Sequence, residues 1–295
     1  MDIAGIIPTL TSQGGGEKYF VRTFELLQKN HDIFLYTMKY DKNVFPSLKK
    51  NIIELGKPWI LKGIFKEHNQ SALLKSIGMK FLEKKIPTTH DIYNFHIFPT
   101  NLINRKPSVY TCQEPPRMLY DLKEQFFEGR NNYFKIISKT YFPFLKQWDK
   151  FRTNYGINNI IVNSQNSKNY ISNIYKTSID VIYPGVEKKF FEVKNNPHKK
   201  ILVVGRLFRS KRVDMAIKAF YKCKNENLKL EVIGNEHEKK NLESLAEKLG
   251  LTNVNFRGRV SENELIKSYS EALLVLYTPI REMFGMVPIE AMAIG

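Results

Sequence analysis

The chain has 295 residues, 42% of them hydrophobic and 25% charged, a composition typical of a globular protein with one or two domains. No run reaches the roughly 18 consecutive apolar residues of a membrane-spanning helix. Lys and Arg outnumber Asp and Glu by 46 to 29, with an excess of 11 basic charges over residues 1–182 and 6 over residues 183–295. This excess favours polyanionic partners, namely nucleic acid, anionic lipid or phosphorylated substrates, or equally a solvated, lysine-rich surface. The two cysteines lack metal-ligand spacing, which favours a cytoplasmic protein with reduced thiols.

Apolar runs and helical spacing alternate through the first half of the chain. From Glu17 the apolar residues Phe20, Phe24 and Leu27 follow helical spacing. The runs predict buried strands of a parallel sheet at residues 2–7, 32–37, 91–98, 108–112, 159–164 and 179–183. Residues 183–199 are polar with a proline near each end, and therefore indicate an interdomain linker.

The alternation restarts after this linker. Strands are expected at residues 200–206, 228–234, 253–258 and 273–278. Gly250 is expected to end one helix, and Ser261 with Glu264 to form a capping box at the start of another. The sequence thus predicts an α/β protein with two facing, Rossmann-like, doubly wound parallel-sheet domains, 1–182 and 200–295. Ligands of such sheets bind at the carboxyl ends of the strands, so the chemistry is expected between the domains.

Three segments at strand ends have residues suited to a phosphorylated ligand. Gly14, Gly15 and Gly16 precede the first helix. Glycines there let the backbone come close to a ligand, and the free N–H groups of the helix start can face an anion. A glycine-rich turn without a ligand fits the pattern equally. Arg206 and Lys211 follow the first strand of the second domain and suit a diphosphate, the alternative being a solvated basic turn.

The third segment, REMFGMVPIE, places Glu282 and Glu290 on either side of a strand-to-helix turn. Gly285 permits an unusual backbone angle there, and the neighbouring N–H groups can face an anion. A carboxylate only accepts hydrogen bonds, so Glu290 suits a ribose diol and Glu282 suits sugar hydroxyls.

Together these motifs resemble a known family. Seven segments, in their order along the chain, are similar to the retaining glycosyltransferases of family 4, which have the GT-B fold. They are GGGE, NIIVNSQNSKNYI, VIYPGVE, VVGRLFRSKRVDMAIKAF, LEVIG, VNFRGRVSENEL and EMFGMVPIEAMAIG. The resemblance implies transfer of a sugar from a nucleotide-diphosphate donor with retention of anomeric configuration. Relatives of this family continue beyond the position of Gly295, so we expect the second domain to be incomplete and the chain to be truncated at its C-terminus.

The resemblance assigns roles to individual residues. Arg206 and Lys211 match the family's diphosphate-binding pair. Glu290 matches the carboxylate that binds the ribose, and Glu282 matches the carboxylate that binds the donor sugar. The expected catalytic residues are Arg206, Lys211 and Glu282. The remaining expected donor-binding positions are Gly15, Gly16, Phe284, Gly285 and Met286.

The segment TCQEPPRMLYD resembles a motif of mannosyltransferase members, with Gln113 where the motif has histidine. Gln113 can donate a hydrogen bond but cannot act as a base, and we place Gln113 and Arg117 on the acceptor side. The motif favours mannose and GDP-mannose, with UDP-glucose and UDP-N-acetylglucosamine left open. The expected acceptor is a glycan or a lipid-linked acceptor, in cell-surface glycan or glycolipid biosynthesis.

The sequence contains no Asp-x-Asp, so neither a metal nor another cofactor is expected. We expect the nucleoside diphosphate to leave while Arg206 and Lys211 stabilise the charge that grows on its β-phosphate. The acceptor hydroxyl is expected to attack from the same face and to give its proton to the leaving phosphate. A nucleotide-sugar epimerase of the same fold and an inactive homologue that only binds are the alternatives. Nucleic acid is not expected as a partner, because no RNP, KH or helix-turn-helix pattern occurs.

Residues 49–85 contain nine lysines and three acids among apolar residues, including Trp59 and Phe65. Such a stretch can lie on an anionic membrane, or it can form a core-packed helix pair with solvated lysines. We therefore predict a cytoplasmic protein that makes peripheral contact with the cytoplasmic face of a membrane.

Overall fold

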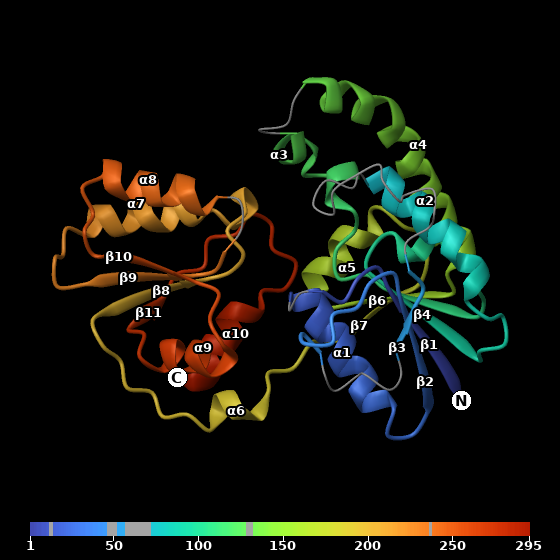
Figure 1. Ribbon diagram of the computed structural model, residues 1–295, viewed down its shortest axis with the longest axis horizontal. Helices are drawn as coiled ribbons and strands as arrows, with labels where there is room; N and C mark the ends of the chain where they lie inside the picture. Colours follow the sequence, from blue (N-terminus) through green and yellow to red (C-terminus); the bar gives the residue numbers. More distant parts are fainter. Residues whose placement is uncertain (12–13, 46–51, 57–71, 128–131, 236–237) are drawn as a thin grey trace. The chain divides into compact units, whose positions relative to one another are not determined.

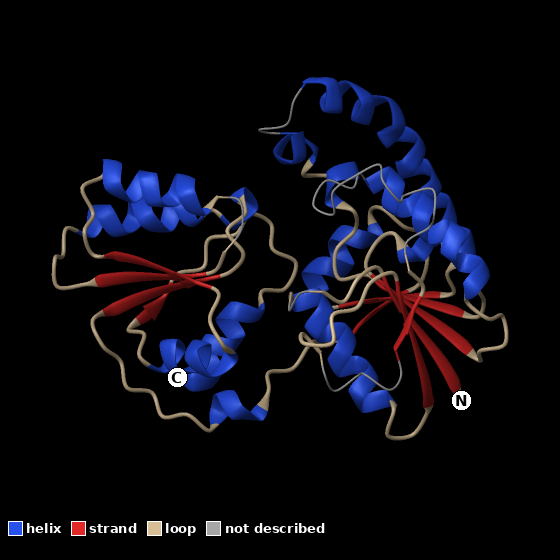
Figure 2. Ribbon diagram, viewed as in Figure 1, coloured by secondary structure: helices blue, strands red, loops and turns tan. Residues whose placement is uncertain are grey.

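The computed structural model describes residues 1–11, 14–45, 52–56, 72–127, 132–235 and 238–295. The chain divides into two compact units, Met1–Pro184 and Gly185–Gly295, and each contains one parallel sheet covered by helices (Figures 1 and 2). Of the predicted stretch 49–85, residues 49–51 and 57–71 lie outside the described residues. No helix among the described residues is long and apolar enough to cross a bilayer.

The sheet of the first unit has seven strands in the order β3-β2-β1-β4-β5-β6-β7, and each neighbouring pair is parallel. Its strands are β1 (Asp2–Ile7), β2 (Asp32–Thr37), β3 (Ile52–Glu54), β4 (Ile92–His96), β5 (Ser108–Thr111), β6 (Asn159–Val162) and β7 (Ile179–Val181). All six strands predicted for this half are present. The additional strand, β3, continues the sheet beyond β2 with Leu35 opposite Ile52.

Helices cover both faces of this sheet, which explains why its strands are apolar throughout. The helices are α1 (Gly15–Leu27), α2 (Ala72–Leu82), α3 (Lys123–Phe127), α4 (Asn132–Gly156) and α5 (Gln165–Ser172), with the short 3-10 turns η4 (Glu83–Lys85), η5 (Thr100–Leu102) and η6 (Arg117–Leu119). On one face, Phe20 and Phe24 of α1 pack among Ile3, Ile7 and Leu35.

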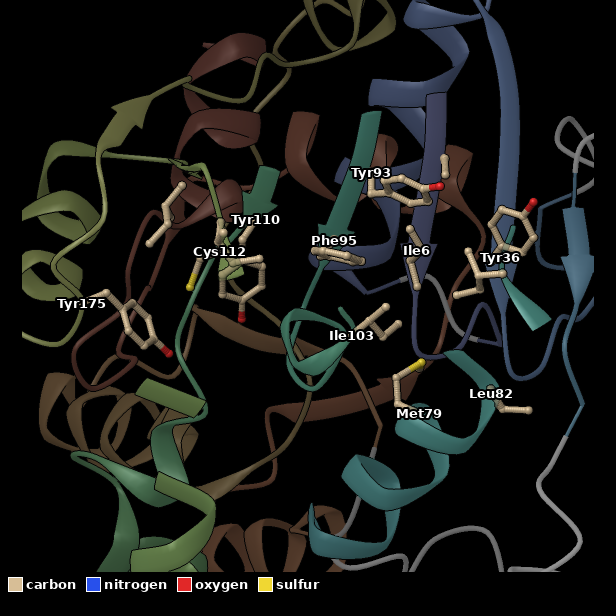
Figure 3. Close-up of a cluster of buried hydrophobic side chains, with 14 of the residues drawn as sticks. Ile6, Tyr36, Met79, Leu82, Tyr93, Phe95, Ile103, Tyr110, Cys112 and Tyr175 are labelled. Carbon is tan, nitrogen blue, oxygen red and sulfur yellow. The ribbon is translucent and has the colours of Figure 1, made fainter. Parts of the chain in front are cut away.

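The other face holds the largest core cluster of the unit. Figure 3 shows Ile6 and Phe95 of the strands on the side of Met79 of α2, with Ile103 between them, and Tyr110 of β5 further along the sheet beside Cys112. α4 packs against η5 and η6, where Leu102 and Leu119 meet its buried Phe142 and Leu145. α4 is therefore in the outermost layer of the unit.

The second unit has a four-stranded parallel sheet in the order β10-β9-β8-β11. Its strands are β8 (Lys200–Val204), β9 (Lys229–Ile233), β10 (Val254–Gly258) and β11 (Leu274–Val275). Its helices are α6 (Lys188–Phe191), α7 (Val213–Cys223), α8 (Lys239–Lys248), α9 (Glu262–Ser270) and α10 (Met286–Ile294), with the 3-10 turn η7 (Arg209–Lys211). The capping box at Ser261 and Glu264 is confirmed, and Gly250 follows α8 with a left-handed φ of +68°, as a helix-ending glycine does.

Two segments of the second unit differ in detail from the sequence pattern. Within residues 183–199, read as a linker, the short helix α6 buries Phe190 against Tyr269 of α9. The strand expected over residues 273–278 pairs only at Leu274 and Val275, and the chain then leaves the sheet. This early departure brings the following residues to the end of β8.

Candidate functional site

Each sheet reverses its strand order at one point. In the first unit, the strands after β1 are added on one side of it (β2, then β3), and the strands after β4 are added on the opposite side (β5, β6 and β7). In the second unit, β9 and β10 are added on one side of β8, and β11 lies on its other side. Loops that leave neighbouring parallel strands in opposite directions open a crevice at their carboxyl ends, where ligands of doubly wound sheets bind. The glycine turn follows β1, and the segments with Arg206 and Glu282 follow β8 and β11. All three predicted phosphate-binding segments therefore lie at such a point.

In the first unit, Gly16 and Gln113 lie together. Gln113 lies two residues after the end of β5, and its Nε2 donates to the Gly16 carbonyl oxygen at 3.3 Å. A Cβ added to Gly16 would lie 2.8 Å from Cδ1 of Ile97, the residue that follows β4. A Cβ added to Gly15 would meet nothing within 4 Å. Gly16 is thus required by close packing, whereas Gly15 leaves open space beside the helix start.

Arg117 is held by an acidic side chain of the same turn. Its Nη2 lies 2.7 Å from Oδ2 of Asp121 and its Nε lies 3.2 Å from Oδ1, a two-pronged ion pair that is largely buried. Burial alone would raise the pKa of Asp121, but the hydrogen bonds from Arg117 outweigh it and lower that pKa. The structure therefore places the guanidinium where it stabilises the turn after Gln113.

His96, the last residue of β4, was not singled out by any sequence pattern. It is fully buried, with its ring edge-on to Phe20 at 4.8 Å and near Phe24 at 5.7 Å. Neither ring nitrogen has a hydrogen-bond partner among the described residues. Burial lowers the pKa of His96 to about 3, so the imidazole is neutral. The signal that could have identified it is a histidine at the carboxyl end of a central strand.

In the second unit, glycines bring the ends of β8 and β9 close together. Gly234 follows β9 with φ of +151°, and a Cβ added there would lie 1.8 Å from the Gly205 carbonyl oxygen. Gly205 in turn donates its N–H to Ile233 at 3.0 Å. Arg206 comes next and is exposed, with its guanidinium carbon 5.3 Å from the centre of the Phe208 ring. This stacking orients the cation without neutralising its charge.

Lys211 and Glu282, which are 71 residues apart in sequence, form an ion pair. Nζ of Lys211 lies 2.5 Å from Oε2 of Glu282, and both side chains are about a quarter exposed (26% and 29%). Tyr277 also hydrogen-bonds to Glu282, and the pKa of this tyrosine is raised by burial and then by the neighbouring carboxylate. An ammonium has three donors and Glu282 occupies one, so Lys211 retains donors for a second anion.

Hydrogen bonds to backbone carbonyl oxygens of the loop after β8 hold these two segments in contact. Oγ1 of Thr278 donates to the carbonyl oxygens of Lys211 and Arg212, both at 3.0 Å. The N–H of Ile280 donates to the Ser210 carbonyl oxygen at 2.8 Å. The chain that leaves β11 therefore lies along the loop after β8, which explains why Glu282 meets Lys211.

The start of α10 brings a second carboxylate to the same region. Gly285 precedes the helix with φ of +89°, and a Cβ there would lie 3.0 Å from the Tyr277 hydroxyl oxygen. The N–H groups of Gly285, Met286 and Val287 belong to the first turn, so they find no acceptor inside the helix, and Pro288 has no N–H. One turn later, Oε2 of Glu290 accepts a hydrogen bond from the Tyr269 hydroxyl at 2.9 Å. Burial and this carboxylate raise the pKa of Tyr269, which therefore remains a donor.

The structure thus brings Gly16 to Gln113 in one unit, and Lys211 to Glu282 in the other, with Arg206 in the same loop as Lys211. Phe284 and Met286 flank Gly285 at the start of α10. The role of each residue toward a ligand stays a prediction. Tyr277 and Tyr269, which hold the two carboxylates, were not identified from the sequence.

Comparison with known proteins supplies the family. Residues 186–295 match the family described as glycosyl transferases group 1. Over 99% of the chain, 28% of residues are identical to the alpha-1,3/1,6-mannosyltransferase ALG2 of Saccharomyces cerevisiae, of which the match covers 68%. The chain is 32% identical, over 46% of its length and 32% of the relative's, to the mouse GDP-Man:Man(3)GlcNAc(2)-PP-Dol alpha-1,2-mannosyltransferase. It is also 32% identical to the O-antigen chain mannosyltransferase RfbU of Salmonella typhimurium, over 54% of the chain and 45% of that protein.

Solved structures show the same fold. Anabaena HepE in complex with UDP-glucose superposes with a TM-score of 0.72 at 17% identity, covering 100% of this chain and 78% of that one. WaaG, a glycosyltransferase of lipopolysaccharide biosynthesis, gives a TM-score of 0.68 at 17% identity, covering 99% and 79%.

The chain is therefore a glycosyltransferase with the GT-B fold. Its second unit belongs to the glycosyl transferases group 1 family. The fold and the family resemblance predicted from the sequence are both confirmed.

Proposed function

We propose that this glycosyltransferase transfers mannose from GDP-mannose to a glycan or lipid-linked acceptor, with retention of anomeric configuration. The observation that carries the proposal is the contact between Lys211 and Glu282 at the switch point of the second sheet. It places a cation for a diphosphate directly beside a carboxylate for sugar hydroxyls. A nucleotide sugar presents these two groups next to each other.

The choice of mannose rests on the relatives. The yeast, mouse and Salmonella proteins are each named as mannosyltransferases, and the name of the mouse protein specifies GDP-Man and a dolichol-linked acceptor. By analogy, we assign this chain to the assembly of cell-surface glycans or glycolipids, with peripheral contact at the cytoplasmic face of a membrane.

In the proposed reaction, the bond between the anomeric carbon and the β-phosphate oxygen breaks as the acceptor oxygen bonds to the same face of that carbon. The acceptor hydroxyl gives its proton to the departing phosphate oxygen, so no protein base is required. Negative charge grows on the diphosphate, where Arg206, Lys211 and the N–H groups at the start of α10 stabilise it. Since these groups supply positive charge, we propose that transfer needs no metal ion or other cofactor.

The remaining donor residues fit this arrangement. Glu290 is proposed to accept from the ribose diol and Glu282 from mannose hydroxyls. The Tyr269 and Tyr277 hydroxyls that hold these two carboxylates fix their orientation before the donor binds. Such prior orientation reduces the entropy lost on binding.

Thermal denaturation with a panel of donors tests the proposal. We expect GDP-mannose to raise the melting temperature most, because a ligand at about 100 times its Kd adds about 2.7 kcal/mol of stability. For a chain of this size that corresponds to roughly 5–10 °C. UDP-glucose and UDP-N-acetylglucosamine are the comparison donors, and GDP alone measures the contribution of the nucleotide. A larger shift with a UDP-sugar than with GDP-mannose would contradict the assignment of the donor.

Product analysis tests the reaction itself. Incubation with GDP-mannose and a lipid-linked glycan should release GDP and form an α-mannoside, and a chelator of divalent metals should leave the rate unchanged. Conversion of the donor into an epimer without GDP release would replace transfer by epimerisation. A β-mannoside would overturn retention.

A further inference from the structure

Left-handed backbone angles are concentrated at the candidate site. Among the described residues, four that are not glycine have a left-handed φ: Ile97, Arg212, Lys224 and Arg281. Arg212 directly follows Lys211, Arg281 directly precedes Glu282, and Ile97 directly follows β4 in the first unit. Such angles are costly for residues with a side chain and persist where the surroundings impose them, which happens most often at functional sites. Three of the four therefore mark segments whose exact course matters.

Ile97 is the least expected of the four. It is β-branched, so its φ of +62° brings its side chain against its own backbone, whereas glycine adopts this angle freely. Thr100 donates to the Ile97 carbonyl oxygen from its N–H at 3.2 Å and from its Oγ1 at 2.9 Å. The turn after β4 therefore imposes the angle and fixes the direction of the Ile97 side chain.

The Ile97 side chain packs on the glycine turn, residues 14–16, that follows β1. In the sheet β4 lies between β1 and β5, so the carboxyl ends of these strands bring the glycine turn, Ile97 and Gln113 together. A Cβ added to Gly16 would lie 2.8 Å from Cδ1 of Ile97 and 3.4 Å from Oε1 of Gln113. Gln113 also donates from Nε2 to the Gly16 carbonyl oxygen at 3.3 Å. Gly16 is thus held between an apolar side chain from one strand end and an amide from the next.

We propose that Ile97 is a positioning residue that, together with Gln113, holds the glycine turn in the arrangement that receives the donor. Gly16 is the second residue of α1, and the Lys18 N–H donates to the Gly14 carbonyl oxygen at 2.9 Å as the first hydrogen bond of that helix. A turn that is already held loses less entropy when a ligand binds to it. The hold on the turn stands on these contacts, and its effect on sugar transfer rests on the proposed function.

Hydrogen exchange without any nucleotide sugar tests the hold on the turn. In Ile97→Gly, the amide of Lys18 should exchange about tenfold faster than in the parent, because the apolar contact on the turn is lost. Ile97→Leu keeps a side chain that can reach Gly16, so its exchange should stay within about threefold of the parent. The amide of Tyr175, which donates to the Ile171 carbonyl oxygen at 2.9 Å elsewhere in the same unit, is the reference and should exchange alike in all variants.

Lys224→Gly is the matched control. Lys224 has φ of +49° and is exposed at the end of α7, in the second unit. Its glycine variant relieves the same type of backbone angle, so it should melt at an equal or higher temperature and leave exchange at Lys18 unchanged. Ile97→Gly should melt within about 3 °C of the parent, because relief of the angle offsets much of the lost burial.

Steady-state kinetics with the donor found in the melting panel tests the effect on sugar transfer. Ile97→Gly should raise KM for the donor about tenfold and keep kcat within about threefold of the parent, because the turn must then be ordered as the donor binds. A residue needed only for folding would instead lower the amount of active enzyme, and hence the apparent kcat, with KM unchanged. Ile97→Leu should restore the parent KM, and Lys224→Gly should keep it.

The exchange and the kinetics decide different parts of the proposal. Unchanged exchange at Lys18 in Ile97→Gly would show that Ile97 does not hold the turn, and would overturn the proposal. Faster exchange with an unchanged KM for the donor would overturn the role of the turn in donor binding. If the parent transfers sugar from no donor of the panel, the proposed function fails, and exchange at Lys18 alone then decides whether Ile97 holds the turn.

Discussion

Replacement of Arg206 by alanine is expected to lower kcat/KM for sugar transfer by about 30- to 900-fold, or about 2–4 kcal/mol of transition-state stabilisation. The guanidinium follows the end of β8, is exposed, and is oriented by stacking on Phe208. In the proposed reaction it meets charge that develops only as the diphosphate leaves. The measurement is steady-state kinetics with the donor found in the melting panel.

Arg209→Ala is the matched control. It removes the same type of side chain from the same loop, but Nε of Arg209 lies 3.5 Å from a carboxylate oxygen of Glu238. We expect kcat/KM of this variant to stay within threefold of the parent. Equal activity of the parent and the Arg206 variant would remove Arg206 from the diphosphate site.

Lys211 requires a double-mutant cycle, because its alanine variant also deprives Glu282 of its partner. If Lys211 only positions Glu282, Lys211→Ala should have no further effect once Glu282 is glutamine. If it binds the diphosphate, as we propose, the Lys211 substitution should still lower kcat/KM about tenfold or more in the Glu282→Gln background. The two expectations differ enough to be separated by initial rates.

The sequence predicted the sheets well because apolar strand runs are local signals. The six strands predicted in the first unit and the four in the second are all present, and the capping box at Ser261 depends only on residues three positions apart. Gly16, Arg206 and Lys211 could be named as candidate site residues because they follow predicted strands, which are themselves local signals. The strand β3 was missed because only three residues pair, two of them exposed.

Nonlocal contacts could not be predicted in this way. Tyr277 reaches Glu282 because the chain leaves the sheet after Val275 and lies along the loop after β8, and no spacing rule describes this path. The helix α4 escaped notice for a different reason. It has aromatic residues on both its buried and its exposed side and Pro143 inside it, so its apolar residues do not follow one helical stripe.

The hydrogen bonds around Asp149 lead to the second large expected effect. This carboxylate is fully buried in α4 and accepts hydrogen bonds from the hydroxyls of Tyr120 at 2.5 Å and Tyr175 at 2.7 Å, and from Nδ2 of Asn101 at 2.7 Å. Tyr120 directly follows η6, the turn that contains Arg117. Asp149 thus ties α4 to the turn on the predicted acceptor side and to the segment before β7.

Asp149→Ala should lower the free energy of unfolding by about 3–5 kcal/mol, because it leaves three buried donors without their acceptor. Tyr175→Phe removes one hydrogen bond and should cost about 1–2 kcal/mol. Asp149→Asn keeps the shape and one acceptor oxygen, so its cost should fall between those two. Urea denaturation of the three variants gives these values. If the Asp149→Ala variant unfolds with a free energy less than about 1 kcal/mol below that of the parent, the carboxylate does not hold these elements together.

The pH dependence of stability provides an independent check on the same carboxylate. Burial raises the pKa of Asp149, and the three hydrogen bonds only partly oppose that effect. Because the folded protein then binds the Asp149 proton more tightly than the unfolded chain does, this group stabilises the fold at low pH. Its contribution is lost as the pH rises from the ordinary aspartate pKa, about 4, through the raised folded value. Asp149→Asn has no such titration, so the stability of the parent relative to this variant should fall as the pH rises above about 4. A relative stability that instead rises with pH over this range would show that the three donors lower the carboxylate pKa more than burial raises it.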